Sequence, residues 1–206
     1  MIDIFGIKPL DLSNVICHSG GAQGSDTYWE NIGETFGVIT RAYSHKTPSH
    51  QSKNKVEISD EDYREGVLEI KKANKFLNRY GIEKYMNMLA RNWSQVKYSD
   101  EIFAIGYIVK VGEKNIKGYY NRGKYDMVDG GTGYAVQMAI NNQKPVYVYD
   151  QKVNNWFRWS YSSLSFVMMK DSPKINFQNF AGIGTRQITK NGIEAITEVY
   201  NKTFNS

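Results

Sequence analysis

Residues 129–137 read Asp-Gly-Gly-Thr-Gly-Tyr-Ala-Val-Gln, a glycine-rich turn that opens a segment with helical spacing. Two further stretches have the same layout: Ser-Gly-Gly-Ala-Gln-Gly-Ser-Asp at 19–26 and Ala-Gly-Ile-Gly-Thr-Arg at 181–186. Each follows a short run rich in β-branched or aromatic residues, which is typical of a strand, and each precedes a helical pattern. The three stretches therefore predict three strand-to-helix junctions.

Turns of this kind bind anions for a physical reason. Glycine has no Cβ, so the backbone can approach a ligand closely. The first N–H groups of a helix have no partner within the helix and point outward with the positive end of the helix dipole. Three such turns predict a phosphate-bearing ligand at the place where they meet.

Length and composition predict one globular domain spanning 1–206. The chain has 206 residues, 41% hydrophobic and 23% charged, which is enough for a single substantial core. The formal net charge of +5 favours anionic partners without choosing between a nucleotide and a nucleic acid. Cys17 is the single cysteine and lies in an apolar run, so we expect a small buried side chain and no internal disulfide.

The start of the chain does not resemble a signal peptide. Met1-Ile2-Asp3-Ile4-Phe5 carries an acid where a basic region would be, and no apolar run approaches the length of a membrane span. We therefore expect a cytoplasmic protein without a membrane partner.

The order of predicted elements favours a Rossmann-like α/β fold, a three-layer sandwich with a mainly parallel sheet. A strand at 14–18, a helix with its apolar face at Trp29, Ile32 and Phe36, and a second strand at 38–43 form the first half-unit. The remaining strands are expected at 101–109, 145–149 and 177–183, and the remaining helices at 59–78, 82–96, 132–141 and, with an inner face at Ile193, Ile196, Val199 and Tyr200, near the end of the chain.

Three stretches do not fit this repeating order. Residues 44–98 are an expected insertion, and their polar part at 44–58 is either a functional lid or a plain mobile excursion. Residues 110–128 predict a β-hairpin with interleaved aromatic and basic residues, a second lid candidate that is either a solvated hairpin or a surface that stacks a base. Residues 150–174 are aromatic but irregular and predict a covering segment.

Two of the glycine stretches resemble a known family. The sequence at 19–26 resembles the SGGA(R/Q)GAD loop of the SLOG superfamily, which includes the DNA-processing protein A family and the Lonely Guy hydrolases. The sequence at 181–189 resembles the GIGSR opening of the same proteins, but here it follows the other loop instead of preceding it. The resemblance implies a circular permutation, with the family's first strand and helix at 175–203; cutting a surface loop leaves the hydrogen bonds of a sheet intact.

The central stretch resembles the Lonely Guy motif PGGxGTxxE with three departures. Asp129 replaces the proline and Tyr134 replaces the threonine. Gln137 replaces the glutamate that the resemblance implicates in cleaving the bond between base and ribose 5-phosphate. Glutamine has no proton to exchange near neutral pH, so general acid–base catalysis at this position is lost. Asp129 is a candidate catalytic substitute, although it precedes the glycines and also fits the role of a turn cap.

Several side chains have expected roles in holding phosphate or sugar. Arg186, expected at a helix N-terminus, is a candidate phosphate clamp because a guanidinium binds phosphate bidentately, and its alternative is a surface ion pair. Asp26 is expected to cap a helix rather than contact the ligand. Ser25 is an alternative to Ser19 as a hydroxyl donor. His45 and His50 lack companions at ligand spacing, so no metal site is expected. The predicted ligand-binding residues are Ser19, Gly20, Gly21, Ala22, Gln23, Gly24, Asp26, Gly130, Gly131, Thr132, Gly133, Tyr134, Gln137, Gly182, Gly184, Thr185 and Arg186.

The expected function is to bind a nucleotide or nucleotide-derived molecule, for sensing or sequestration and without a further cofactor. The family resemblance implies ligands such as ADP-ribose derivatives, cyclic nucleotide signals or nucleoside monophosphates. A phosphoribohydrolase or other N-glycosidase is the alternative from another class, and single-stranded DNA binding is a third hypothesis. The resemblance also implies a homo-oligomer. The aromatic residues of 150–174 make this segment either a candidate interface or a lid.

Overall fold

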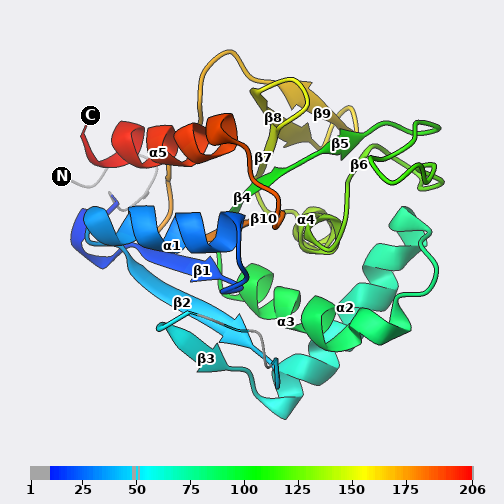
Figure 1. Ribbon diagram of the computed structural model, residues 1–206, viewed down its shortest axis with the longest axis horizontal. Helices are drawn as coiled ribbons and strands as arrows, with labels where there is room; N and C mark the ends of the chain where they lie inside the picture. Colours follow the sequence, from blue (N-terminus) through cyan, green and yellow to red (C-terminus); the bar gives the residue numbers. More distant parts are fainter. Residues whose placement is uncertain (1–9, 48–49, 51, 206) are drawn as a thin grey trace.

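The computed structural model describes residues 10–47, 50 and 52–205, so the parts of the expected 1–206 domain at 1–9, 48–49, 51 and 206 lie outside the described residues. An eight-stranded sheet with helices on both faces forms the molecule (Figure 1). This arrangement confirms the predicted Rossmann-like α/β fold. In spatial order the strands of the sheet are β3 (Lys55–Glu57), β2 (Ile39–Ser44), β1 (Ile16–Ser19), β10 (Asn179–Gly184), β4 (Glu101–Gly106), β7 (Val146–Asp150), β8 (Asn155–Ser160) and β9 (Ser165–Met168).

The last strand of the chain lies in the middle of the sheet. β10 pairs in parallel with β1 on one side and with β4 on the other, and β1–β2, β2–β3 and β4–β7 are also parallel. The backbone of β10 is buried on both faces, as expected for a central parallel strand. Because β1 and β10 are parallel neighbours, the loops that follow them leave the same edge of the sheet side by side.

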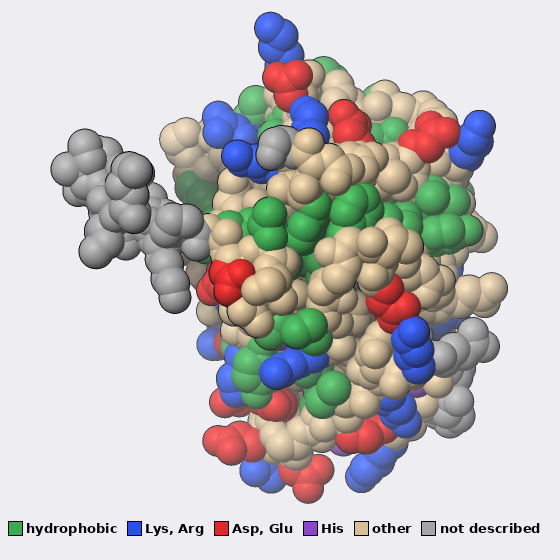
Figure 2. Space-filling model, turned by 90° about the vertical axis from the view of Figure 1, so that its left-hand side faces the viewer, with side chains coloured by type: hydrophobic (Ala, Val, Ile, Leu, Met, Phe, Trp, Pro, Cys, Tyr) green, Lys and Arg blue, Asp and Glu red, His purple; other side chains and the backbone are tan. Residues whose placement is uncertain are grey.

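Two helices cover one face of the sheet. They are α1 (Ser25–Thr35) and α5 (Lys190–Phe204), which lie together in Figure 1. Trp29 of α1 packs its ring against Phe103, Phe180 and Tyr200 at centroid distances of 5.6–5.9 Å. Figure 2 shows the side of the molecule on which both helices end, where hydrophobic side chains form a band across the middle.

Three helices cover the opposite face. α3 (Met86–Lys97) and α4 (Thr132–Asn141) pack against the sheet, and α2 (Asp60–Leu77) packs on both of these helices as an outer layer. Ser59 caps α2, because its side chain accepts a hydrogen bond from the N–H of Asp62.

Residues 150–174 are not irregular, and this prediction was wrong. They contain β8 and β9, which extend the sheet in antiparallel fashion beyond β7. Turns at Asn154 and Leu164, both at positive φ, reverse the chain before and after β8. Trp156 and Trp159 of β8 are buried on the sheet faces, so each of these two tryptophans belongs to one of the two cores.

Other boundaries also differ from the predictions. The 44–58 stretch includes the edge strand β3, and the helix expected at 82–96 begins only at Met86, after the short 3-10 helix η2 (Glu83–Tyr85). The strand expected at 101–109 is divided into β4 and β5 (Ile108–Val109). β5 pairs with β6 (Met127–Val128) in a separate two-stranded sheet, so the hairpin expected at 110–128 has strands at its base and an irregular middle. The short 3-10 helix η1 (Leu12–Asn14) precedes β1.

Within the described part of the chain, no helix is long and apolar enough to cross a membrane.

Candidate functional site

The loop between β1 and α1 brings the first glycine cluster against the last one. Gly24 is the N-cap of α1 and has a φ of 104°, and a Cβ at this position would lie 2.6 Å from the Cα of Arg186. The backbone N–H and the hydroxyl of Ser25 both donate to the carbonyl of Thr185, at 3.1 and 2.8 Å. Position 184 also requires glycine, because a Cβ there would lie 2.6 Å from the hydroxyl oxygen of Ser25. These two stretches, 160 positions apart at Ser25 and Thr185, therefore form one structural unit.

Asp26 fixes both loops with one buried carboxylate. Its Oδ2 accepts from the N–H of Ala22 at 3.3 Å and its Oδ1 accepts from the N–H of Gly184 at 3.2 Å. Burial raises the pKa of Asp26, whereas Arg91 and the loop N–H groups oppose that rise. Asp26 was predicted to cap the helix; the structure gives the N-cap position to Gly24 and uses Asp26 to join the two glycine loops.

A cavity of about 420 Å³ opens beside this unit, at the carboxyl ends of the parallel strands. Its lining comes from the loop after β1, the segment after β2, the start of α3 and the turn after β10. The lining residues are Gly20, Gly21, Ala22, Lys46, Thr47, His50, Glu83, Lys84, Tyr85, Met86, Asn87, Met88, Arg91 and Arg186.

Arg91 of α3 is the most unusual side chain in this lining. It is buried, and neither its Nε nor its Nη1 has a hydrogen-bond partner among the described residues. The nearest carboxylate oxygen, Oδ2 of Asp26, lies 4.0 Å from Nη1, which is too far for a hydrogen bond. The guanidinium lies so close to Gly20 that a Cβ there would be 2.6 Å from its Cζ. Burial lowers the pKa of Arg91, and the charge of Asp26 opposes this effect.

His50 also faces the cavity without a hydrogen-bond partner. Both of its ring nitrogens are buried and unpaired within the described structure, and its ring occupies the space that a Cβ on Gly21 would need. Burial lowers the pKa of His50, and the nearby charges of Arg91 and Lys55 lower it further. The imidazole is therefore neutral at neutral pH, with one nitrogen able to donate and the other to accept.

The segment after β2 is held against α1 by hydrogen bonds. The hydroxyl of Ser52 donates to Glu30 of α1, and the same carboxylate accepts from Ser19 at 3.2 Å. Lys53 and Asn54 bond to Glu34, one helical turn further along α1. These contacts hold residues 52–54 against α1.

Arg186 lines the cavity, but not from the helix N-terminus that the sequence predicted. α5 begins at Lys190 and is capped by Thr189, whose hydroxyl accepts from the N–H of Gly192. Arg186 instead lies against Gly24, at the N-terminus of α1, and it is exposed. The predicted surface ion pair for Arg186 is not among the ion pairs of the described residues.

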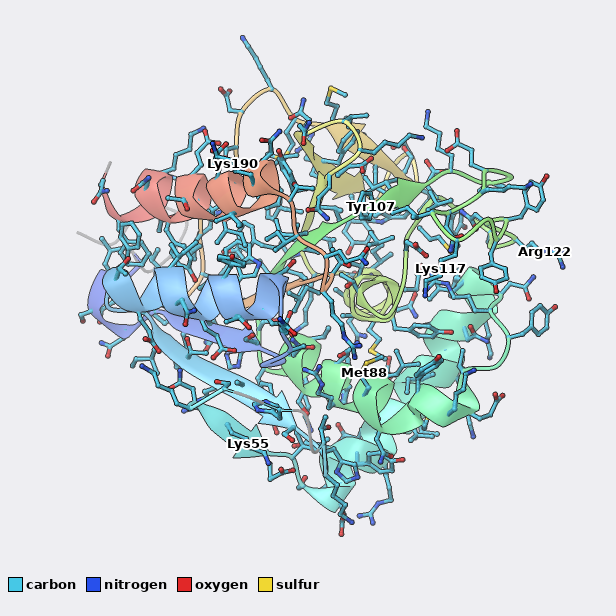
Figure 3. The ribbon with its side chains drawn as sticks, viewed as in Figure 1. Lys55, Met88, Tyr107, Lys117, Arg122 and Lys190 are labelled. Carbon is cyan, nitrogen blue, oxygen red and sulfur yellow. The ribbon has the colours of Figure 1, made fainter. Side chains whose placement is uncertain are left out.

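The central glycine loop is next to the cavity but does not line it. Arg79 holds this loop, since its guanidinium donates to the carbonyls of Val128 at 2.7 Å and Gly130 at 2.6 Å. Gly131 touches Met88, which does line the cavity; a Cβ on Gly131 would lie 3.2 Å from its Cε. Figure 3 shows Met88 between α3 and α4. The expected meeting of three loops is thus a meeting of two, with the third behind Met88.

Side chains of the central stretch are used inside the protein. The Tyr134 hydroxyl donates to Asn74 at 2.7 Å, and the Gln137 amide donates to Asn141 at 2.9 Å; both side chains are buried. Asp129 accepts from Asn115 and from the N–H of Gly130, each at 2.8 Å, so it caps its own turn. Neither Tyr134 nor Gln137 lines this cavity, and their predicted contact with a ligand stays a prediction.

The other predicted residues divide into those that line the cavity, one that serves packing, and those that belong to the loops without lining the cavity. Gly20, Gly21, Ala22 and Arg186 line the cavity. Gly182 packs against Trp29 on the α1 side of the sheet, where a Cβ would lie 2.6 Å from the indole, so it serves packing. The others belong to the loops without lining the cavity: Ser19, Gln23, Gly24, Asp26, Gly184 and Thr185 around the first unit, and Gly130, Gly131, Thr132 and Gly133 around the third loop.

Sequence reasoning missed Arg91, Lys46 and Lys84, and considered His50 only as a metal ligand. The helix that carries Arg91 has buried polar residues beside its apolar positions, including Arg91, Asn92 and Gln95. An arginine within the buried face of a helix that has no acid of its own was the signal available in the sequence.

The fold and the cavity together define a Rossmann-like α/β protein with a cationic pocket at the carboxyl ends of its strands. A scan against protein-family models, a search of curated proteins and a search of solved structures found no match to this chain.

Proposed function

We propose that the cavity binds the phosphate of a nucleotide or nucleotide-derived small molecule, and that the protein senses or sequesters this ligand. The observation that carries the proposal is the buried guanidinium of Arg91, whose Nε and Nη1 lack partners within the described residues. A buried charge without hydrogen bonds is costly, and phosphate oxygens are good acceptors for guanidinium donors.

The charge of the cavity supports the same ligand class. Four basic side chains line it, Lys46, Lys84, Arg91 and Arg186, against the single acid Glu83. The neutral ring of His50 adds a further donor next to Arg91. Basic groups converging in a cavity of about 420 Å³ attract and hold an anion of small-molecule size.

We also propose that the chain is a circularly permuted relative of the SLOG superfamily. The position of β10 between β1 and β4 supports this proposal, because it sets the Gly-Ile-Gly-Thr-Arg turn beside the Ser-Gly-Gly-Ala loop despite their distance in sequence. Binding is favoured over hydrolysis, because Asp129 and Gln137, the positions aligned with the Lonely Guy motif, do not line the cavity.

Calorimetric titration with inorganic pyrophosphate tests the phosphate site, and mass spectrometry of molecules released by heat from the purified protein tests for a natural ligand. Arg186→Ala is expected to weaken pyrophosphate binding about tenfold, since it removes a charged hydrogen-bond donor from an exposed position. Arg122→Ala is the matched control, because Arg122 is exposed on the 110–126 segment far from α1 (Figure 3). Absence of pyrophosphate binding to the wild-type protein, with no phosphate compound released, would overturn the proposal.

A further inference from the structure

The cavity has two walls of different chemistry. The loop after β1, Arg91 and Arg186 form a polar, cationic wall beside the N-terminus of α1. The second wall is one continuous stretch, residues 83–88 of η2 and the start of α3. A bare phosphate needs only the first wall, so the second wall indicates a larger ligand.

Three of the six residues in the second wall have apolar side chains. Tyr85, Met86 and Met88 all line the cavity, and the ammonium of Lys84 lies 5.2 Å from the centre of the Tyr85 ring. Methionine adapts its shape and makes favourable contacts with aromatic rings. A volume of about 420 Å³ falls in the range of pockets that hold small organic ligands. This wall therefore fits a planar ring joined to the phosphate.

Glu83 is the single acid in the lining, and it belongs to this second wall. Within the described chain it makes no ion pair, and a carboxylate repels phosphate. Its charge acts on Tyr134 of α4: burial raises the pKa of Tyr134, Arg79 opposes the rise, and the charge of Glu83 adds to it. A carboxylate can only accept hydrogen bonds, so Glu83 fits a part of the ligand that donates them.

We propose, building on the phosphate site above, that the ligand is a nucleoside phosphate held in one orientation. Its phosphate contacts Arg91 and Arg186, its base packs on Tyr85, Met86 and Met88, and Glu83 accepts hydrogen bonds from a neutral donor of the nucleoside. The ribose diol and an exocyclic amine of the base are the two sources of such a donor. Glu83 is thus a specificity-determining residue and has no role in holding phosphate.

Calorimetric titrations of wild-type protein and Glu83→Gln test this orientation. The probes are pyrophosphate, inorganic phosphate, and AMP, GMP, CMP and UMP. The tightest nucleotide should bind at least tenfold more tightly than inorganic phosphate, and Glu83→Gln should weaken it about tenfold while changing pyrophosphate affinity less than twofold. Glu198→Gln, the same charge change on an exposed residue of α5, should change neither.

The 2′-deoxy form of the tightest nucleotide separates the two donors. If the ribose diol is the donor, the 2′-deoxy form binds the wild type weakly, and Glu83→Gln does not weaken its binding further. If an amine is the donor, the 2′-deoxy form binds the wild type as tightly as the parent nucleotide, and Glu83→Gln weakens that binding. Equal effects of Glu83→Gln on nucleotide and pyrophosphate, or no effect on either, would overturn the inference. Pyrophosphate binding without a nucleotide preference would also overturn it while leaving the phosphate site standing, whereas no binding of any probe would remove the phosphate site itself.

Discussion

Arg91 and Gly20 show at the residue scale how the site depends on a missing side chain. The guanidinium of Arg91 occupies the space beside Gly20, and Asp26 lies next to both. The Asp26 carboxylate is committed to backbone N–H groups of two loops, which leaves Arg91 with charge compensation but without a hydrogen bond from it. The arrangement keeps the loops rigid and the guanidinium available to an anion.

Gly20→Ala is predicted to damage binding more than folding. The added methyl would lie 2.6 Å from Cζ of Arg91, so the guanidinium must move, and pyrophosphate affinity should fall at least tenfold. Gly118→Ala is the control, because its φ of 83° makes alanine strained there although nothing crowds the new methyl. Calorimetry on both variants checks the prediction; equal pyrophosphate affinity of Gly20→Ala and wild type would contradict it.

At the element scale, the two glycine loops are neighbours because β1 and β10 are parallel neighbours. Parallel strands carry their following loops to the same edge, where Ser25, Asp26 and Thr185 join them. The third loop follows β6, which belongs to the small second sheet, and Arg79 fastens it against the end of α2. Gly131 of this loop packs against Met88 and is the N-cap of α4.

Arg79→Met is predicted to destabilise the protein without changing the phosphate site. The variant removes the guanidinium hydrogen bonds to the carbonyls of Val128 and Gly130 and should lower the free energy of unfolding by about 2–4 kcal/mol. Urea denaturation measures this loss. Pyrophosphate affinity should stay within twofold of wild type; a large drop in affinity of the folded variant would place the third loop in the binding site.

On the scale of the whole molecule, local patterns predicted the alternating elements, but the site depends on contacts between distant segments. The helix with Trp29, Ile32 and Phe36 was predictable because a 3.6-residue period identifies a buried face. β8 and β9 were missed because they are short strands between tight turns, and their pairing partners are set by β7. Arg91 was missed because nothing in its own helix shows that it faces Gly20, more than 60 positions earlier in the chain.

The stability of the whole fold should depend on Glu101 at the opposite, amino end of the sheet. Its carboxylate accepts from the N–H groups of Asn176 at 2.6 Å and Phe177 at 3.1 Å, and burial raises its pKa from 4.5 to about 7. A raised acid pKa means that the folded state binds more protons than the unfolded state between these values. Stability from this group is complete below pH 4.5 and is lost as the pH rises to about 7.

Glu101→Gln should remove this pH-dependent loss of unfolding free energy, which amounts to about 3 kcal/mol. The measurement is the difference in unfolding free energy between variant and wild type at pH 5 and pH 8, with the variant gaining relative stability at pH 8. The difference is needed because His18 acts in the opposite sense: burial lowers its pKa to about 4, so its contribution rises with pH. A constant difference across this range would contradict the prediction.

The central claim is that the guanidinium of Arg91 binds the phosphate of the ligand. Titration of pyrophosphate into Arg91→Gln tests this claim most directly. Near-UV circular dichroism establishes that the variant is folded, and Arg122→Gln provides the same substitution at an exposed site. Loss of two charged donors predicts about a hundredfold weaker binding for Arg91→Gln and unchanged binding for Arg122→Gln. Equal pyrophosphate affinity in wild type and folded Arg91→Gln would contradict the claim.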